Sequence, residues 1–208
     1  AEDGAVVTAG LHIMKSTSPV ASLQCRAIIE WLRAEAGTSS SDPLADARAR
    51  WVAWRANQVT KLVRNVHAAA VRRRPPAVVS SSGGPSPVEF YACYRDARRW
   101  LDEGLNTHVF PMNYTADLET LREKLDVQWN STPPERRQNV YPGLQIYSRR
   151  TVDGEVRVEP QHADIVEGQL RLVHEVGYTG FALFAYNTLS EDVVEAVRRV
   201  SQATDPTQ

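Results

Sequence analysis

The 208 residues are 42% hydrophobic and 24% charged, which predicts a globular domain with a buried core rather than a disordered chain. A formal net charge of −1 excludes a general electrostatic field for nucleic acid or an anionic membrane. No apolar run approaches the roughly 18 residues of a membrane span, so we expect a soluble protein without nucleic-acid partners.

The N-terminus shows no leader, and the residue types that commonly bind metals show no ligand pattern. The first residues lack an initiator methionine and a basic leader, so we expect a processed or fragmentary N-terminus in an unassigned compartment. Cys25 and Cys93 fit neither a zinc site nor a disulfide scaffold. The five histidines show no ligand spacing, and we therefore expect neither a metal nor another cofactor.

A long helix is predicted after Asp42-Pro43, which supplies a cap and a first helical position. Its apolar residues recur at steps of three and four and share one face: Trp51, Trp54, Val59, Leu62, Val63, Val66 and Ala70. Core packing explains Trp31, Trp51, Trp54 and Trp100 better than a ligand-stacking role does, whereas Trp129 fits either role. Arg72-Arg73-Arg74 fits the carbonyl end of this helix better than a nucleic-acid site.

Short apolar strands then alternate with amphipathic helices. Strands are predicted at 77–80, 107–111, 140–146 and 180–185, and helices at 89–103, 117–127, 161–176 and 191–201. Such alternation indicates parallel strands joined by helical crossovers, hence an α/β fold.

Both a doubly wound sheet and a (β/α)8 TIM barrel satisfy this pattern. No strand is followed by a glycine-rich dinucleotide or phosphate loop. Polar and aromatic residues instead follow the strands, and in a barrel they would share the face where active sites form. These predicted ligand-binding residues are Ser80, Met112, Asn113, Tyr114, Tyr147 and Tyr186.

Several sequence pieces, in order, resemble the glycoside-hydrolase-like family 10, a group of barrel proteins with presumed carbohydrate-active function. They are Trp54-Arg55-x-x-Gln58-Val59-Thr60, Val78-Val79-Ser80, Asp96 with Trp100-Leu101-x-x-Gly104-Leu105, Val109-Phe110-Pro111-Met112-Asn113-Tyr114-Thr115-x-Asp117, Tyr141-x-Gly143-Leu144-x-Ile146-Tyr147, and Gly177-x-x-Gly180-Phe181-Ala182-Leu183-Phe184.

The resemblance implies a partial barrel that runs from about strand four or five to strand eight. Residues 1–41 would hold a degenerate strand-four region and a helix, residues 42–203 the C-terminal barrel half, and residues 204–208 a tail. Strands one to three would lie upstream of Ala1. Half a barrel leaves unpaired strand edges, so we expect a protein partner or a second copy to cover them.

The resemblance also implies a carboxylate at the end of strand four, and this sequence lacks it. Two alignments of the segment place Thr8 or Met14 at that position. Asp117 and Asp96 are the predicted catalytic acids. A helix cap is the favoured alternative for Asp117, and an arginine-paired surface acid is the alternative for Asp96.

Two functions therefore stand side by side. One is a catalytically degenerate barrel half that serves as a binding or scaffold subunit. The other is an active glycoside hydrolase whose remaining strands and second carboxylate lie outside this chain. In both, Asn113 and Tyr114 would contact sugar hydroxyls and ring faces, with packing in the barrel mouth as the alternative for Tyr114.

Overall fold

The computed structural model describes residues 43–203, with side chains from residue 48 onward. The chain divides into two compact units, residues 1–107 and 108–208, which are described separately. The expectations for Thr8, Met14, Trp31 and the segments 1–41 and 204–208 lie outside the described residues. Among the described residues, no helix combines the length and apolar character needed to cross a membrane.

In the first unit, the long helix α3 (Pro43–Arg73) buries a narrow face of small side chains. Val52, Ala56 and Thr60 are 6%, 2% and 1% exposed. Trp100 of helix α5 (Ala97–Asp102) is also buried, and its indole Nε1 donates a hydrogen bond to Thr60 Oγ1 at 2.9 Å. The prediction that Trp100 lies in the core is confirmed.

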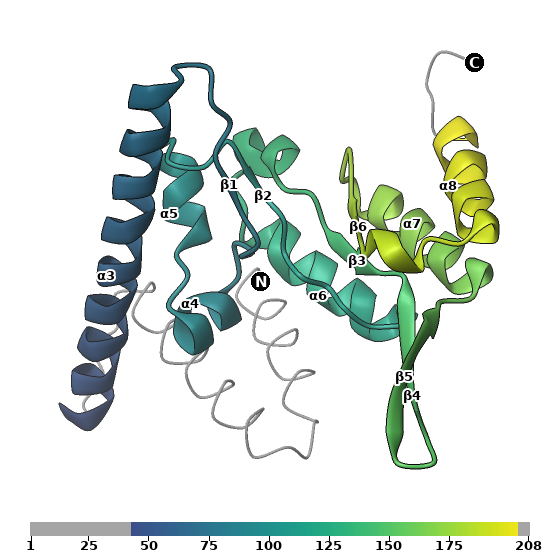
Figure 1. Cartoon of the computed structure of the whole chain (residues 1–208). Coiled ribbons are helices and arrows are strands. Elements are labelled where there is room, and N and C mark those ends of the chain that lie inside the picture. The colour runs from purple at the N-terminus through teal and green to yellow at the C-terminus, as the bar shows by residue number, and fades with distance from the viewer. Residues whose placement is uncertain (1–42, 204–208) are drawn as a thin grey trace, which may run out of the picture. The chain divides into compact units, whose positions relative to one another are not determined.

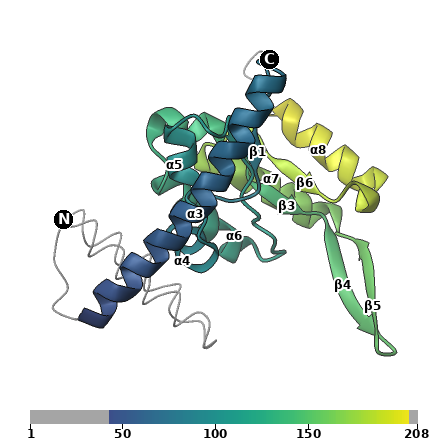
Figure 2. The same cartoon turned by 60° about the vertical axis from the view of Figure 1, so that its left-hand side comes forward.

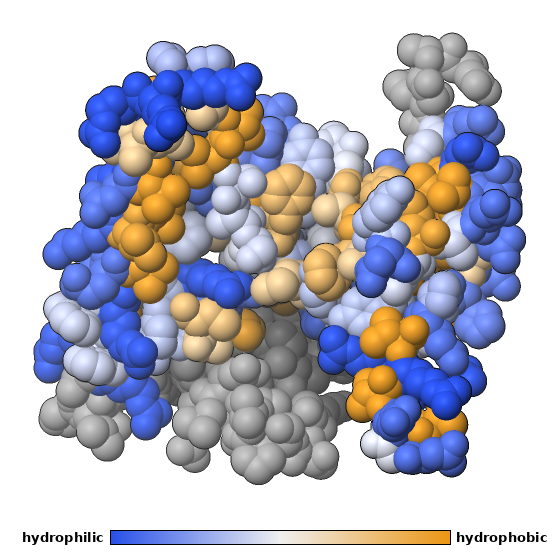
Figure 3. All heavy atoms as spheres, in the orientation of Figure 1, coloured by the Kyte–Doolittle hydropathy of each residue, from blue (hydrophilic) through white to orange (hydrophobic). Residues whose placement is uncertain are grey.

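Four of the seven residues in the apolar stripe predicted as the buried face of α3 instead face outward, and the other three are partly buried. Trp51, Trp54, Leu62 and Val66 are each more than half exposed, and the two tryptophan rings stack with centroids 5.2 Å apart. Figure 3 shows apolar side chains along α3 at the surface. The core prediction for Trp51 and Trp54 is therefore wrong, because α3 packs through the small residues of its opposite face.

The single helix predicted at 89–103 is interrupted. Helix α4 (Pro87–Cys93) ends at Tyr94, whose φ of 58° is left-handed and incompatible with helix continuation. Asp96 then starts α5 by accepting a hydrogen bond from the Arg99 N–H. Strand β1 (Ser80–Ser81) precedes α4 and is shorter than the strand predicted at 77–80.

The second unit carries parallel strands separated by helices, as Figure 1 shows. Strand β2 (His108–Val109) and the residues after it bridge in parallel to the segment of strand β3 (Gly143–Gln145). Strand β3 pairs in parallel with β6 (Ala182–Phe184), with Leu144 opposite Leu183. The predicted α/β fold is thereby confirmed.

Three helices line this set of strands, and neighbouring helices pack on each other: α6 (Leu118–Asn130) on α7 (Ala163–Val176), and α7 on α8 (Glu191–Ala203). Figure 2 shows α7 and α8 side by side. Short 3-10 helices η1 (Pro134–Asn139) and η2 (Tyr186–Thr188) complete the loops. The fully buried core consists of Val109, Leu121, Leu125, Val140, Leu144, Val166, Leu170, Val173, Val193 and Ala196.

Trp129, for which the sequence allowed either core packing or ligand stacking, packs at the C-terminal end of α6. Its ring meets Tyr178 edge-on, with centroids 5.0 Å apart, and the Arg137 guanidinium lies 4.5 Å from its centroid. A Cβ on Gly177 would lie 2.9 Å from this indole, and the φ of Gly177 is 111°. Glycine at this position therefore allows both the helix stop and the close approach of Trp129.

A two-stranded antiparallel hairpin interrupts the alternation between β3 and α7. Strand β4 (Tyr147–Val152) pairs with β5 (Glu155–Pro160) along its whole length. The connection is Asp153-Gly154, with φ values of 54° and 80°, as a tight hairpin turn requires. Figures 1 and 2 both show the hairpin extending away from the strands and helices of the second unit.

Candidate functional site

Three aromatic rings gather at the carboxyl ends of the parallel strands in the second unit. Tyr114 and Phe184 stack almost parallel, with ring centroids 5.4 Å apart and an interplanar angle of 14°. Tyr147 meets Phe184 at 66°, with centroids 6.3 Å apart. We call Tyr114, Tyr147 and Phe184 the aromatic platform.

Strand register explains why these rings meet. Gln145 lies opposite Phe184 in the parallel pair, and the Ile146 N–H donates to the Phe184 carbonyl at 3.0 Å. Gly143 lies beneath Tyr114: a Cβ there would be 3.8 Å from the Tyr114 ring and only 3.0 Å from the Pro111 carbonyl oxygen. The absent side chain at residue 143 therefore lets the chain carrying Tyr114 approach β3 closely.

The platform is partly buried and has one open ring. Tyr147 is 9% exposed, whereas Phe184 is 50% exposed. Burial raises the pKa of the Tyr114 phenol, and the neighbouring Tyr147 adds to that shift. The Tyr114 phenol is therefore a neutral hydrogen-bonding group at physiological pH, beside the half-exposed ring of Phe184.

Two further residues predicted to bind ligand, Met112 and Tyr186, are exposed. Met112 is 40% exposed and forms a parallel bridge with Gly143, and Tyr186 follows β6 and is 89% exposed. Ser80 lies in β1 of the first unit and is exposed, and its neighbour Ser81 accepts a hydrogen bond from Asn106. The structure thus brings Tyr114 and Tyr147 together within the second unit.

Asn113 is fully buried and its side-chain amide is already paired. Its Nδ2 donates to Gln128 Oε1 at 3.1 Å, and Gln128 Nε2 donates to Asn113 Oδ1 at 2.8 Å. This pair links the loop after β2 to α6. Direct ligand contact by Asn113, as predicted, would require its side chain, which is 0% exposed, to reach the surface.

Asp117, one of the two predicted catalytic acids, occupies the N-cap of α6. Its Oδ2 accepts from the Thr120 N–H at 3.4 Å and from Thr120 Oγ1 at 3.3 Å. The carboxylate is exposed to solvent. Asp117 therefore caps α6, which was the alternative role that the sequence favoured.

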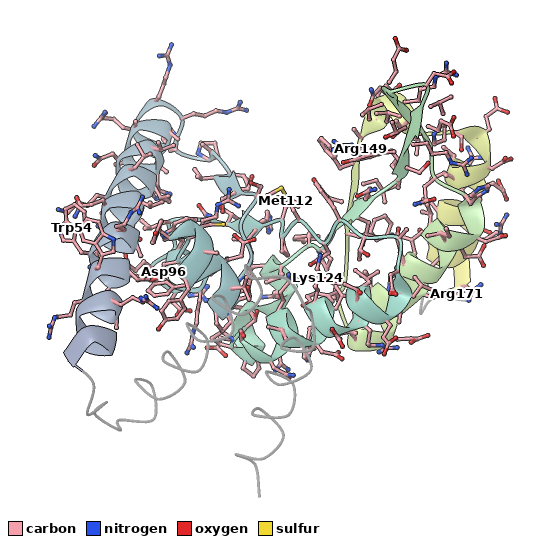
Figure 4. The ribbon with its side chains drawn as sticks, turned by 90° about the horizontal axis from the view of Figure 1, so that it is seen from below. Trp54, Asp96, Met112, Lys124, Arg149 and Arg171 are labelled. Atoms are coloured by element: carbon pink, nitrogen blue, oxygen red, sulfur yellow. The ribbon has the colours of Figure 1, made fainter. Side chains whose placement is uncertain are left out.

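Asp96, the other predicted acid, lies in the first unit with Glu89 and Arg95 close by in sequence (Figure 4 labels Asp96). Asp96 caps α5, and burial raises the pKa of its carboxyl despite the N–H and charge of Arg99. The alternative that the sequence suggested for Asp96 was pairing with an arginine. The neighbouring Arg95 pairs with Glu89 instead, whose carboxylate lies 3.3 Å from Arg95 Nη1.

Glu89 is an acid that the sequence reasoning did not select. It lies in the first turn of α4, the helix that follows β1, and its N–H is capped by Ser86. Burial raises the pKa of the Glu89 carboxyl, and the charge and hydrogen bond of Arg95 lower it only in part. The sequence feature that could have identified Glu89 is the helix-capping pattern Ser86-Pro87-x-Glu89, which follows a predicted strand.

Phe184 was also missed, although it ends a recognised motif. It lies one residue before the end of the strand predicted at 180–185 and is the last residue of β6, a position that could have marked it as a strand-end side chain. Within residues 43–203, no group of three or more His, Cys, Asp or Glu is placed to hold a metal ion. A pocket between α6 and α7, lined by Leu118, Arg122, Gly168 and Arg171 among others, lies on the helical layer rather than at the strand ends.

Comparisons with known proteins agree with this geometry at the level of fold. A family model described as glycosyl hydrolase-like 10 matches residues 28–164. A solved chitinase from Chromobacterium violaceum has a similar fold, with a TM-score of 0.50 and 14% sequence identity. The match covers 70% of this chain and only 61% of the chitinase. No curated protein matches the sequence significantly.

Proposed function

Because the chain belongs to the glycosyl hydrolase-like 10 family, we propose that it is a glycoside-hydrolase-derived protein that binds carbohydrate without cleaving it. The observation that carries this proposal is the aromatic platform. Phe184 offers a half-exposed ring at the carboxyl ends of parallel strands, backed by Tyr114 and flanked by Tyr147. Ligands of parallel α/β proteins bind at this end of the strands.

The positions of the acids support the absence of catalysis. Glycoside hydrolysis normally needs two carboxyl groups about 5 to 9.5 Å apart across the scissile bond. Asp117 and Asp96 each use a carboxylate oxygen to cap a helix. The expected strand-four carboxylate is replaced by Thr8 or Met14 in the sequence.

In this proposal, residues 42–203 supply about strand four or five to strand eight of a (β/α)8 barrel. Strands β2, β3 and β6 run parallel and lie side by side in chain order, as neighbouring barrel strands do. Ala182 and Leu183 of β6 are only half-buried while Leu144 of β3 is fully buried. We propose that a partner chain or second copy pairs with this open side.

Titration calorimetry with a panel of neutral oligosaccharides, including chito-oligosaccharides, tests the binding role. Phe184→Ala should weaken the affinity by about tenfold, because it removes the exposed stacking ring. Trp54→Ala is the matched control, since that ring is 54% exposed against 50% for Phe184. Binding by no oligosaccharide, or equal losses in both variants, would overturn the proposal.

An active hydrolase is the alternative function. The observation that favours it is the raised pKa of the Glu89 carboxyl. A carboxyl with a raised pKa close to a strand end can serve as a general acid. The test is hydrolysis of the same panel by the full chain, compared with Glu89→Gln. Turnover that this variant abolishes would establish the enzyme and defeat the binding-only proposal.

Light scattering tests the proposed partner. If a second copy covers the edge of β6, the measured molar mass should be that of a dimer. Leu183→Lys on that strand should shift the molar mass toward that of a monomer. Leu62→Lys is the matched control, because it introduces the same charge at a leucine of α3 that is 62% exposed. A stable monomer that hydrolyses glycans would contradict the partner-completed role.

A further inference from the structure

We propose that Arg149 of the hairpin makes the carbohydrate site selective for glycans that carry an anionic group, a uronic acid carboxylate or a sulfate ester. The inference rests on the proposed carbohydrate binding by the aromatic platform. Arg149 lies with its guanidinium carbon 5.3 Å from the centroid of the Tyr147 ring, so it borders the platform directly. In Figure 4, Arg149 leaves the hairpin on the side where Met112 lies.

The base of the hairpin is fixed to the strands that carry the platform. The Ile146 N–H donates to the Phe184 carbonyl, and the Gln161 N–H donates to the Ile146 carbonyl, both at 3.0 Å. Gln145 Nε2 also donates to the Tyr147 carbonyl at 2.6 Å. These bonds hold Tyr147, the first residue of β4, beside Phe184, and Arg149 contacts the other ring of this pair, Tyr147.

Strand register gives the hairpin two chemically different faces. Tyr147 lies opposite Pro160, Arg149 opposite Val158, and Thr151 opposite Val156, so these residues share one face. Val156 and Val158 are 66% and 52% exposed, and Figure 3 shows apolar patches on the hairpin. The face that continues from the platform is therefore apolar, with Arg149 as its only formal charge.

The remaining hairpin charges lie on the opposite face or at the turn. Arg150 pairs in register with Arg157 on that opposite face, where Arg150 lies 3.9 Å from Glu159. Within the described part of the chain, no acidic side chain lies at ion-pair distance from Arg149. The hairpin holds three arginines and three acids, so a general attraction for anions is not expected.

An unneutralised guanidinium beside a sugar-stacking surface has a specific chemical use. Its planar fork matches the two oxygens of a carboxylate or sulfate, and the contact with Tyr147 restricts its rotation. A pyranose resting on Phe184 would bring a substituent of its ring, or of the next sugar, within reach of this fork. The neutral sugar would supply stacking and the anion would supply selectivity.

Calorimetric titration of the full chain tests this assignment with three probes of matched length: an oligogalacturonate, a sulfated galactan oligosaccharide and a neutral oligosaccharide. We expect at least one anionic probe to bind about tenfold more tightly than the neutral one, with the advantage falling as salt is raised. The better of the two anionic probes identifies the carboxylate or the sulfate as the recognised group.

Arg149→Gln should remove the anionic preference and leave affinity for the neutral probe unchanged, which also reports that the site is folded. Arg157→Gln removes the same charge from the opposite face of the same hairpin, and should keep the preference. Equal losses in both variants, or no anionic preference in the unmodified protein, would overturn the assignment to Arg149. Failure of all three probes to bind would instead overturn the proposed carbohydrate binding itself.

Discussion

Asn113 and Gln128 hold each other through a reciprocal pair of amide hydrogen bonds, at 3.1 and 2.8 Å, with both side chains buried. The pair ties the loop that carries Tyr114 to helix α6. The pair therefore positions the loop and does not contact the ligand, since both side chains are buried.

Asn113→Ala should lower the free energy of unfolding by about 1 to 3 kcal/mol, because it leaves the buried Gln128 amide unsatisfied. Chemical denaturation measures the change. The double variant Asn113→Ala/Gln128→Ala should lose less than the sum of the two single variants. Strict additivity would show that the two amides are not coupled; Asn57→Ala on α3 is an exposed control.

Tyr178→Phe should cost about 1 kcal/mol, because the Tyr178 hydroxyl donates to the Leu125 carbonyl at 3.0 Å in a buried site. Burial, with the nearby Asp126, raises the pKa of this phenol above its ordinary value of 10.0. Its neutral form therefore contributes stability that is present below pH 10 and is lost as the pH rises further.

Unfolding curves for the unmodified protein and Tyr178→Phe should accordingly converge as the pH rises above about 10. Tyr186→Phe is the control, because that side chain is 89% exposed and removal of its hydroxyl should leave the stability unchanged. A constant difference between the unmodified protein and Tyr178→Phe at all pH values would contradict this account.

Glu89 should make the stability fall between acid and neutral pH. Its folded-state pKa is raised above 4.5 by burial, so its contribution is complete below pH 4.5 and declines as the pH rises through the folded pKa. Glu89→Gln removes this titration. The free energy of unfolding of the variant, relative to the unmodified protein, should therefore increase from pH 4 to pH 7, and a decrease would refute the assignment.

Asp117→Ala should destabilise the protein by about 1 kcal/mol through loss of the α6 N-cap, whereas Asp117→Asn should keep most of that stability. Thermal unfolding separates the two variants. If hydrolytic activity is found, the same pair becomes a test of catalysis: a stable Asp117→Asn variant without activity would assign Asp117 a chemical role beyond capping.

Trp100→Ala should cost about 3 to 5 kcal/mol, since the ring is 2% exposed and bonded to Thr60. Trp54→Ala should cost about 1 kcal/mol or less, because the ring is 54% exposed and contacts mainly Trp51. Denaturant midpoints of the two variants measure the contrast. Similar losses in both would mean that the outer stripe of α3 is covered in solution.

The order of helices and parallel strands in the second unit can be predicted from the sequence, and so can the family. The apolar strand runs, the cap at Asp117 and the glycine at 177 each act over a few residues, so local chemistry specifies them. The β4–β5 hairpin was not predicted but could have been, because Asp153-Gly154 is a local turn signal between two segments that alternate in side-chain character.

Long-range packing, in contrast, sets which side chains face one another and which remain at the surface. The period of α3 places Trp51 and Trp54 on one face, but packing against Trp100 selected the opposite face of small residues for burial. Phe184 meets Tyr114 across sequence-distant strands, and Asn113 finds Gln128 on another element. Such pairings depend on register between segments, which no local pattern encodes, and they define the aromatic platform and its neighbour Arg149.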